Sequence, residues 1–150
     1  MAIIEAVNRR HKYRAFSKES GMWDWDKLCG FKEFPPHLLS CLVSNQDGSW
    51  IVMEWTGLLD KNLKEIYEDD LVIAWSQGSK ATFVIKWRQE GSPCFILYPA
   101  WQGGQMWYLH GSNDRKGNWV DDIEVIGNIH ETPEKIPPTI YKSYLLPNVE

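Results

Sequence analysis

Apolar residues of this 150-residue chain recur in short runs, and glycine or Asx turns separate these runs. Residues 12–16 alternate polar with apolar side chains, and residues 50–55 form a run rich in aromatic and β-branched side chains. Short runs of this kind between turn residues are typical of β-strands, and no long amphipathic helix intervenes. The pattern predicts an all-β fold, β-dominated with minor helical turns.

Turn chemistry assigns these runs to antiparallel pairs. Residues 12–16 are expected to turn back into a strand at residues 22–25, which forms a first hairpin. Residues 71–75 are expected to pair with residues 81–87 across a five-residue loop. Residues 119–130 then supply a closing strand.

Two further pairings are predicted in the remaining runs. Residues 94–98 and 105–109 flank a Gly-Gly turn and suggest a pair with each other. Residues 38–43 form either a short helix or a buried strand, because periodicity does not separate the two over so few residues. The turn that follows them favours a hairpin with residues 50–55.

Short, sequential, antiparallel strands close most economically into a small barrel or a pair of packed sheets. We therefore expect one compact antiparallel barrel-like domain over residues 1–131. The Pro-rich tail at 132–150 carries four prolines and either wraps onto this domain or extends from it. A chain of this length typically buries about 68–70% of its unfolded surface, which is enough for a real core.

Composition narrows the class of protein. Apolar residues make up 43% of the chain and charged residues 24%, which is typical of a soluble globular domain. Nine tryptophans favour sheet over helix bundle, and they are expected as core or interface anchors. No apolar run approaches the roughly 20 residues of a membrane-spanning helix, and the chain begins without a secretory pattern, so we expect a cytoplasmic location and no membrane contact.

Titratable residues show no spacing typical of a catalytic or metal site. The acids at 65–70 and 121–124 are interpreted as solvated turns, and the histidines His11, His37, His110 and His130 as isolated surface residues. The cysteines Cys29, Cys41 and Cys94 are odd in number and widely spaced, so we expect reduced, buried thiols. The sequence therefore predicts no catalytic, cofactor-binding or metal-binding residues, and an enzyme is the least favoured class.

Residues 9–18 hold five Lys or Arg residues and two aromatics without an acid. Such a segment can bind a single nucleic-acid strand by phosphate pairing and base stacking. The candidate contacts are Arg9, Arg10, Lys12, Tyr13 and Arg14. The preferred interpretation is a strand with a basic outer face and aromatics in the core, because the net charge of −4 disfavours affinity for phosphate.

The central segment, residues 55–72, carries the most distinctive local pattern, WTGLLDKNLKEIYEDDLV. It resembles the signature of the YopX family of phage and prophage proteins, which reads Thr-Gly-Leu, Lys-Asn-Gly, Lys-Glu-Ile-Tyr-Glu and Gly-Asp before two apolar residues. The opening hairpin and the closing strand resemble the same family. The matching residues are interpreted as a structural clamp of turns and anchors: Thr56, Gly57, Leu58, Asp60, Asn62, Ile66, Tyr67 and Asp70.

Two positions depart from that family pattern, because Leu63 and Asp69 stand where glycine is usual. The turn geometry is retained if Asn62 or Asp69 adopts a positive φ, since Asx residues tolerate it better than other non-glycine residues. The resemblance implies a compact barrel-like domain and no settled biochemical activity.

These observations favour a non-enzymatic accessory protein of phage or prophage type. It is expected to self-associate as a homo-oligomer, or to bind a phage or host protein, through exposed aromatic surface and sheet edges. The alternative is a weak single-stranded nucleic-acid binder that uses the basic N-terminal strand.

Overall fold

The computed structural model describes residues 11–30, 50–76, 78–89, 91–110 and 122–140. Strands dominate this part of the chain, as the sequence predicts. The strands are β1 (Tyr13–Ser17), β2 (Gly21–Trp23), β3 (Ile51–Leu59), β4 (Glu65–Tyr67), β5 (Asp70–Ser76), β6 (Ser79–Arg88), β7 (Cys94–Tyr98), β8 (Trp101–Gln102), β9 (Gln105–Met106) and β10 (Ile123–Asn128). The helical elements are α1 (Trp25–Cys29) and a 3-10 turn, η1 (Pro133–Lys135), and residues 138–140, at the end of the described range, are also helical.

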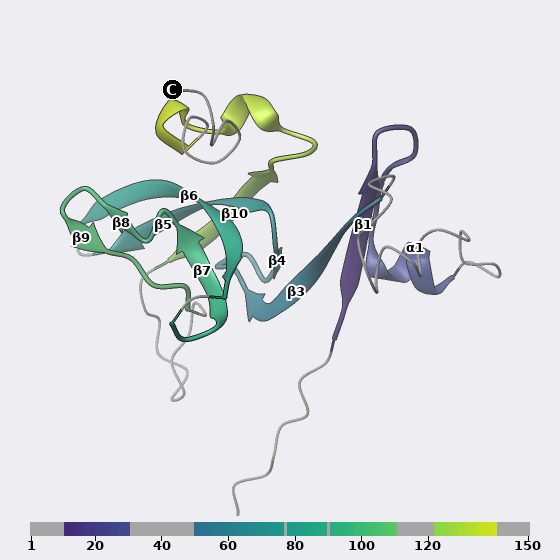
Figure 1. Ribbon diagram of the computed structural model, residues 1–150, viewed down its shortest axis with the longest axis horizontal. Helices are drawn as coiled ribbons and strands as arrows, with labels where there is room; N and C mark the ends of the chain where they lie inside the picture. The colour runs from purple at the N-terminus through teal and green to yellow at the C-terminus, as the bar shows by residue number, and fades with distance from the viewer. Residues whose placement is uncertain (1–10, 31–49, 77, 90, 111–121, 141–150) are drawn as a thin grey trace, which may run out of the picture.

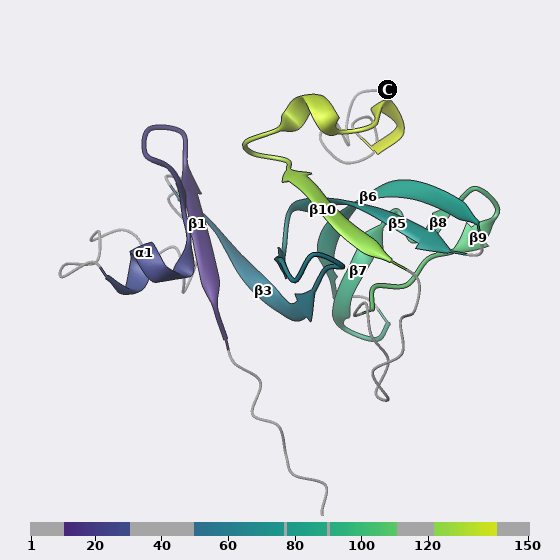
Figure 2. The ribbon, with the colours of Figure 1, turned by 180° about the vertical axis from the view of Figure 1, so that it is seen from behind.

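The strands form two four-stranded antiparallel sheets with the orders β2-β1-β3-β4 and β10-β5-β6-β7. The second sheet curls into a half-barrel, and the pair β8-β9 lies at one end of it (Figure 1). Strands β1 and β2 and helix α1 stand to one side as an N-terminal lobe, which the long strand β3 joins to the barrel (Figures 1 and 2). The first half of β3 pairs with β1 and its second half pairs with β4.

The main core fills the half-barrel. Its centre is apolar, with Phe83, Ile85 and Leu97 from β6 and β7 packed against Ile123 of β10, all at 1% exposure or less. Residues that follow β10 cover the opposite face of this sheet, because Ile136 and Ile140 pack on Leu71 and Val84. Residues 132–140 of the predicted tail are thus packed, and residues 141–150 lie outside the described part.

The first hairpin and the β5-β6 hairpin are confirmed, and β10 supplies the closing strand. The second strand of the first hairpin ends earlier than predicted, at Trp23, because Asp24 caps a helix instead. Its Oδ1 accepts a hydrogen bond from the Lys27 amide at 2.8 Å. The run predicted at 50–55 is confirmed and continues to Leu59, while its predicted partner at 38–43 and the start of the closing strand, 119–121, lie outside the described residues.

The predicted pairing of residues 94–98 with 105–109 is wrong. Strand β7 folds back on β6, with Phe95 opposite Trp87, and β9 pairs with β8. Gly103 and Gly104 have φ values of 62° and 80°, as a type I′ turn requires, and such a two-residue turn pairs the residues directly beside it. In the short β8-β9 hairpin, Trp101 is therefore the cross-strand partner of Met106.

Both positions that lack the family glycine have a positive φ, 65° at Leu63 and 68° at Asp69. The expectation for Asp69 is confirmed. Asn62 does not take a positive φ, because Leu63 itself adopts the left-handed conformation in the first turn. The buried Asp60 fixes this turn, since its Oδ1 accepts hydrogen bonds from the amides of Asn62 and Lys64 at 2.8 and 2.9 Å.

The expected burial of the cysteines is wrong for Cys29, which is exposed at the end of α1, whose buried side chain is Leu28. Cys94 is partly exposed, and both thiols are free. Cys41 lies outside the described residues. None of the helices in the described ranges has the length and hydrophobicity that crossing a membrane requires.

Candidate functional site

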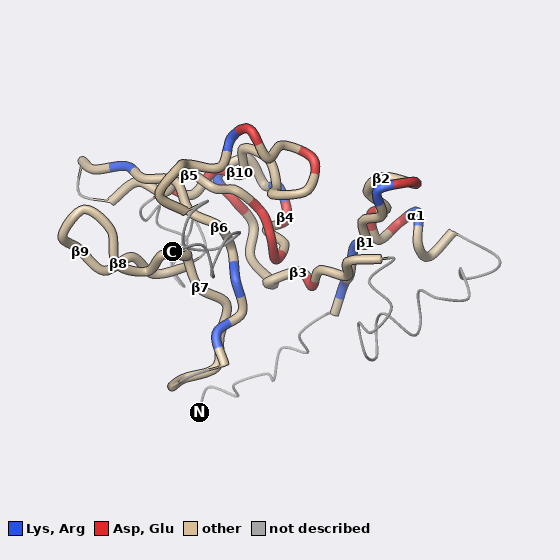
Figure 3. The backbone as a smooth tube through the Cα atoms, turned by 45° about the horizontal axis from the view of Figure 1, so that its top comes forward, with Lys and Arg blue, Asp and Glu red and all other residues tan. Residues whose placement is uncertain are grey.

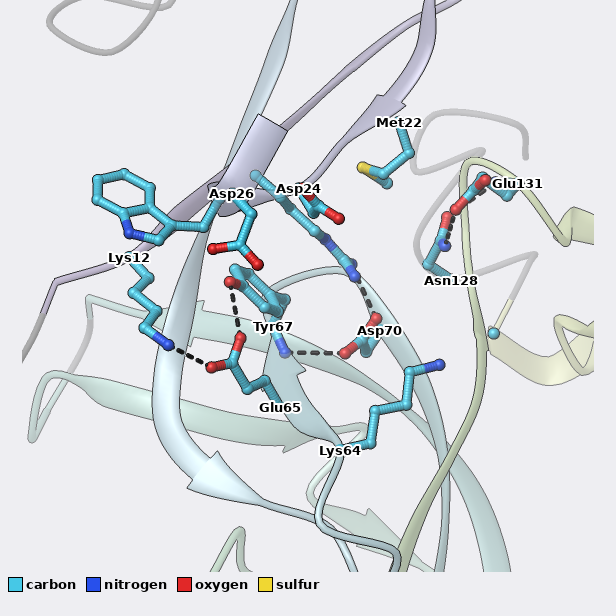
Figure 4. Close-up of a pocket in the computed structure, with 13 residues that line it drawn as sticks. Lys12, Met22, Asp24, Asp26, Lys64, Glu65, Tyr67, Asp70, Asn128 and Glu131 are labelled. Atoms are coloured by element: carbon cyan, nitrogen blue, oxygen red, sulfur yellow. Dashed lines mark hydrogen bonds and ion pairs between the residues drawn. The ribbon is translucent and has the colours of Figure 1, made fainter. Parts of the chain in front are cut away.

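A cleft of ≈ 390 Å³ separates the N-terminal lobe from the barrel. One wall comes from β1, β2 and the start of α1, and the other comes from β4, the start of β5 and the end of β10 with the turn after it. Figure 3 shows basic segments on β1 and acidic segments around β4, on the two sides of this junction. Figure 4 shows the lining side chains, which are mostly charged.

The floor of the cleft is a buried ion pair. Arg14 Nη2 lies 2.8 Å from Asp70 Oδ1, and the side chains are only 11% and 1% exposed. The same nitrogen donates to the carbonyl of Glu68 at 3.1 Å, and the guanidinium lies 4.8 Å from the centre of the Tyr67 ring. Asp70 Oδ2 also accepts the Tyr67 amide at 2.8 Å. Arg14 Nε is buried and has no hydrogen-bond partner among the residues described.

Burial changes the protonation equilibria at this floor. Desolvation raises the pKa of Asp70 above its usual range, although the charge of Arg14 works in the opposite direction. Desolvation, together with the adjacent carboxylate of Glu65, also raises the pKa of the Tyr67 hydroxyl. Tyr67 therefore stays protonated and donates to Glu65 Oε2 at 3.1 Å (Figure 4).

Lys12, just before β1, and Arg14, within it, are both paired within the molecule. Lys12 Nζ binds Glu65 Oε1 and lies 4.9 Å from the centre of the Trp55 ring. Tyr13 packs on Trp25, with ring centroids 6.2 Å apart. The interpretation of β1 as a strand with an outward basic face is wrong at Arg14, because Asp70 draws that side chain inward. Arg9 and Arg10 lie outside the described residues.

A second buried acid adjoins the floor. Asp69 is 4% exposed, binds Lys86 Nζ through Oδ1, and has Oδ2 at 2.8 Å from His130 Nε2. Phe16 of β1 stacks on the His130 ring at 5.1 Å. Burial disfavours the Asp69 carboxylate, but the hydrogen bond with His130 and the charge of Lys86 outweigh it, so the pKa of Asp69 is lowered.

These contacts correct two sequence interpretations. The acidic corner at 68–70 is not a solvated turn, because Asp69 and Asp70 are both buried against basic partners. His130 is not an isolated surface residue, since its side chain is 13% exposed and paired. His37 and Asp121 lie outside the described residues. No group of three His, Cys, Asp or Glu side chains that could hold a metal occurs within the described ranges.

The far end of the barrel carries a different surface, which we call the display hairpin. It consists of β8, β9 and the two residues after β9, which together span residues 101–108. Trp101, Met106 and Tyr108 are 62%, 47% and 72% exposed. Trp107, between them, is 6% exposed and packs on Phe83, with ring centroids 5.0 Å apart. Its Nε1 donates to the Gln102 carbonyl at 3.0 Å, and its amide donates to the Ala100 carbonyl at 2.7 Å. The buried ring of Trp107 thus holds the hairpin against the barrel core, while the side chains of Trp101, Met106 and Tyr108 are exposed to solvent.

A groove of ≈ 470 Å³ runs beside the display hairpin. Gln102, Gly103 and Gln105 of the hairpin line one part of it, and Lys80 and Thr82 of β6 line another. The side-chain oxygen of Gln102 is buried there without a hydrogen-bond partner in the described part of the chain. The groove therefore offers an unused acceptor next to exposed aromatic surface.

Comparison with known proteins identifies the family. Residues 12–137 match the family model described as YopX protein. This chain belongs to the YopX family. Among solved structures, it is similar to the crystal structure of protein EF1440 from Enterococcus faecalis, with 21% identity over 83% of this chain and 96% of that chain and a TM-score of 0.49. A comparison with curated proteins gave no match.

The YopX signature residues of this chain have structural contacts. Thr56 Oγ1 donates to the Ile66 carbonyl at 2.8 Å and accepts from the Leu58 amide, next to Gly57 with its φ of 87°. Asp60 Oδ2 accepts the Val125 amide of β10 at 2.9 Å, which ties the β3-β4 turn to the closing strand. Tyr67 and Asp70 reach the cleft. Sequence reasoning missed the cleft because its halves lie far apart along the chain, and it missed the display hairpin because the pairing of β9 was assigned to β7.

Proposed function

We propose that this YopX family member is a non-enzymatic accessory protein of phage or prophage type that acts by binding protein through the display hairpin. The observation that carries the proposal is the arrangement of Trp101, Met106 and Tyr108, which are exposed on a hairpin that buried Trp107 holds in place. Large side chains on a fixed backbone lose little conformational freedom on binding, and Trp and Tyr are the residues that most often dominate protein interfaces.

The groove beside the hairpin supports a protein partner. A backbone or side-chain N–H group of a partner would satisfy the Gln102 acceptor while its apolar side chains cover Trp101. The nucleic-acid alternative has less support, because the charges of Lys12 and Arg14 are used by Glu65 and Asp70. Phosphate would have to displace these carboxylates in a protein whose net charge is −4.

The first experiment measures self-association by size-exclusion chromatography with light scattering over a range of concentrations. The wild type is expected to exceed the 17.5 kDa of the monomer as concentration rises. The double variant Trp101→Ser, Tyr108→Ser is expected to remain monomeric. Trp87→Ser is the matched control, because it removes a 43%-exposed tryptophan from the other end of β6.

The second experiment covers a partner other than a second copy. A photo-crosslinking amino acid at position 101 is expected to give a discrete crosslinked product in host cells, and the same amino acid at exposed Lys18 is not. A monomer at all concentrations together with equal products from positions 101 and 18 would refute the proposal.

A further inference from the structure

We infer that the cleft between the N-terminal lobe and the barrel binds a peptide segment that carries a lysine or arginine side chain. This site is separate from the display hairpin, and the two signature residues that line it, Tyr67 and Asp70, were predicted from the sequence to have only structural roles. The inference rests on the charge balance of the cleft, its apolar walls and one buried donor that lacks an acceptor.

The charge balance favours a cationic group. Among the described residues, five carboxylates and three basic side chains line the cleft, and two ion pairs, Lys12–Glu65 and Arg14–Asp70, use four of these groups. In this described part of the lining, Lys64 is the remaining cation, and three carboxylates remain beside it: Asp24, Asp26 and Glu131. Asp24 accepts a hydrogen bond from a backbone amide and Glu131 accepts one from the side-chain amide of Asn128, so neither exposed carboxylate has a basic partner among the described residues. Figure 4 shows Asp24 and Asp26 on the lobe side of the cleft and Glu131 on the barrel side.

The walls suit the alkyl stem of a basic side chain. Met22, Trp25 and Tyr67 line the same space as the acids. Lysine and arginine pack their methylene groups on apolar surface while the charged end reaches a carboxylate or an aromatic face. The molecule already uses this chemistry beside the cleft, where Lys12 lies over Trp55 and Arg14 lies over Tyr67.

The buried donor distinguishes a peptide from a simple cation. Arg14 is 9% exposed, and its Nε lacks an acceptor in the described part of the chain. A charged N–H buried without an acceptor is unfavourable, so a ligand oxygen at this point would be stabilising. Peptides carry carbonyl oxygens next to their cationic side chains, whereas polyamines carry cations only. Lys64, whose ammonium has no ion pair among the described residues, offers a second donor to the same backbone.

The volume is consistent with this ligand class. The ≈ 390 Å³ of the cleft is near the lower end of about 300–1,000 Å³ for small-ligand sites. It accommodates one long side chain with its adjoining backbone and not a folded domain. We therefore expect recognition of a short basic segment.

Binding is tested by fluorescence anisotropy with a labelled, end-capped peptide of two arginines between glycines. The double variant Asp26→Asn, Glu131→Gln is expected to weaken binding about tenfold or more, since each acid contributes a charge-assisted contact. The single control Glu134→Gln removes an exposed acid outside the cleft and is expected to leave the affinity unchanged. Asp24 is left intact because it caps α1.

Competition distinguishes the ligand sources. Unlabelled peptide is expected to displace the probe, and spermidine at equal charge is expected to compete at least about tenfold less well, because it supplies no acceptor for Arg14. Equal weakening by Glu134→Gln, equal competition by spermidine, or no binding at millimolar peptide would each overturn the inference. The Trp101→Ser, Tyr108→Ser variant is expected to bind the peptide normally, so failure here and failure of the display hairpin can be told apart.

Discussion

The half-barrel and the junction between barrel and N-terminal lobe both have buried centres, but these centres are stabilised in different ways. In the half-barrel the fully buried side chains are apolar, with Phe83, Ile85 and Ile123 at 0% exposure. At the junction the most buried contact is the ion pair of Arg14 with Asp70. Apolar burial is non-directional, so the core tolerates changes that keep its volume. A buried ion pair is directional, and removal of either partner leaves an uncompensated charge.

The comparison explains why a cleft persists at the junction. Charged groups need specific partners and cannot collapse on one another as apolar side chains do. The two ion pairs fix the lobe at the edge of β4, and the acids that have no basic partner keep the remaining space polar. The junction thus sets the orientation of the lobe, while apolar burial stabilises the half-barrel.

The largest expected effect comes from breaking the junction at its centre. Asp70→Ala leaves the Arg14 guanidinium buried without its carboxylate, and we expect the free energy of unfolding to fall by about 3–5 kcal/mol. Chemical denaturation followed by tryptophan fluorescence measures this loss.

The matched control replaces both charges with apolar side chains of similar size, as in Arg14→Met with Asp70→Leu. Such replacements are often neutral or stabilising, so the double variant is expected to recover most of the stability. If it is as unstable as Asp70→Ala, the backbone contacts of Asp70 with Tyr67, and not its charge, hold the junction.

The same contrast explains how far the sequence could predict this molecule. Apolar alternation and turn residues are local signals, and they located β1, β3, β5, β6 and β10. The Arg14–Asp70 pair joins residues 56 positions apart, so no local pattern reveals it, and a basic residue on a strand normally predicts an outward side chain. The pairing of β7 was missed for a related reason, because a Gly-Gly turn fixes only the residues beside it.

A smaller effect is expected from acid titration of the two neighbouring aspartates. The pKa of Asp70 is raised, chiefly by burial, and the pKa of Asp69 is lowered, because His130 and Lys86 outweigh its burial. We expect Asp70 to protonate first as pH falls, and Asp69 to protonate below the ordinary aspartate value of 3.8. Carboxyl carbon shifts in NMR spectra, assigned with Asp69→Asn and Asp70→Asn, give the order directly.

The two shifts act on stability with opposite signs. A lowered pKa in the folded state means that Asp69 contributes stability above its unfolded pKa and loses it as pH falls through the folded value. A raised pKa in the folded state means that Asp70 contributes to the free energy of unfolding when it is protonated. This contribution is lost as pH rises through the folded pKa. Asp69→Asn is therefore expected to reduce the acid sensitivity of unfolding, and unchanged sensitivity would show that Lys86 and His130 do not stabilise the Asp69 carboxylate.

The smallest expected change in stability concerns the two non-glycine residues with a positive φ, Leu63 and Asp69. Leu63 is 74% exposed and has a φ of 65°, so its side chain gains little burial in return for a strained backbone. Leu63→Gly is expected to raise the free energy of unfolding by up to about 1 kcal/mol, because relief of the left-handed strain exceeds the entropy lost by glycine. Asp69→Gly relieves the same strain but removes the partner of Lys86 and His130, and we expect it to destabilise. Thermal unfolding of the two variants side by side measures both signs. Stabilisation by both glycines would mean that the buried contacts of Asp69 do not offset its own backbone strain.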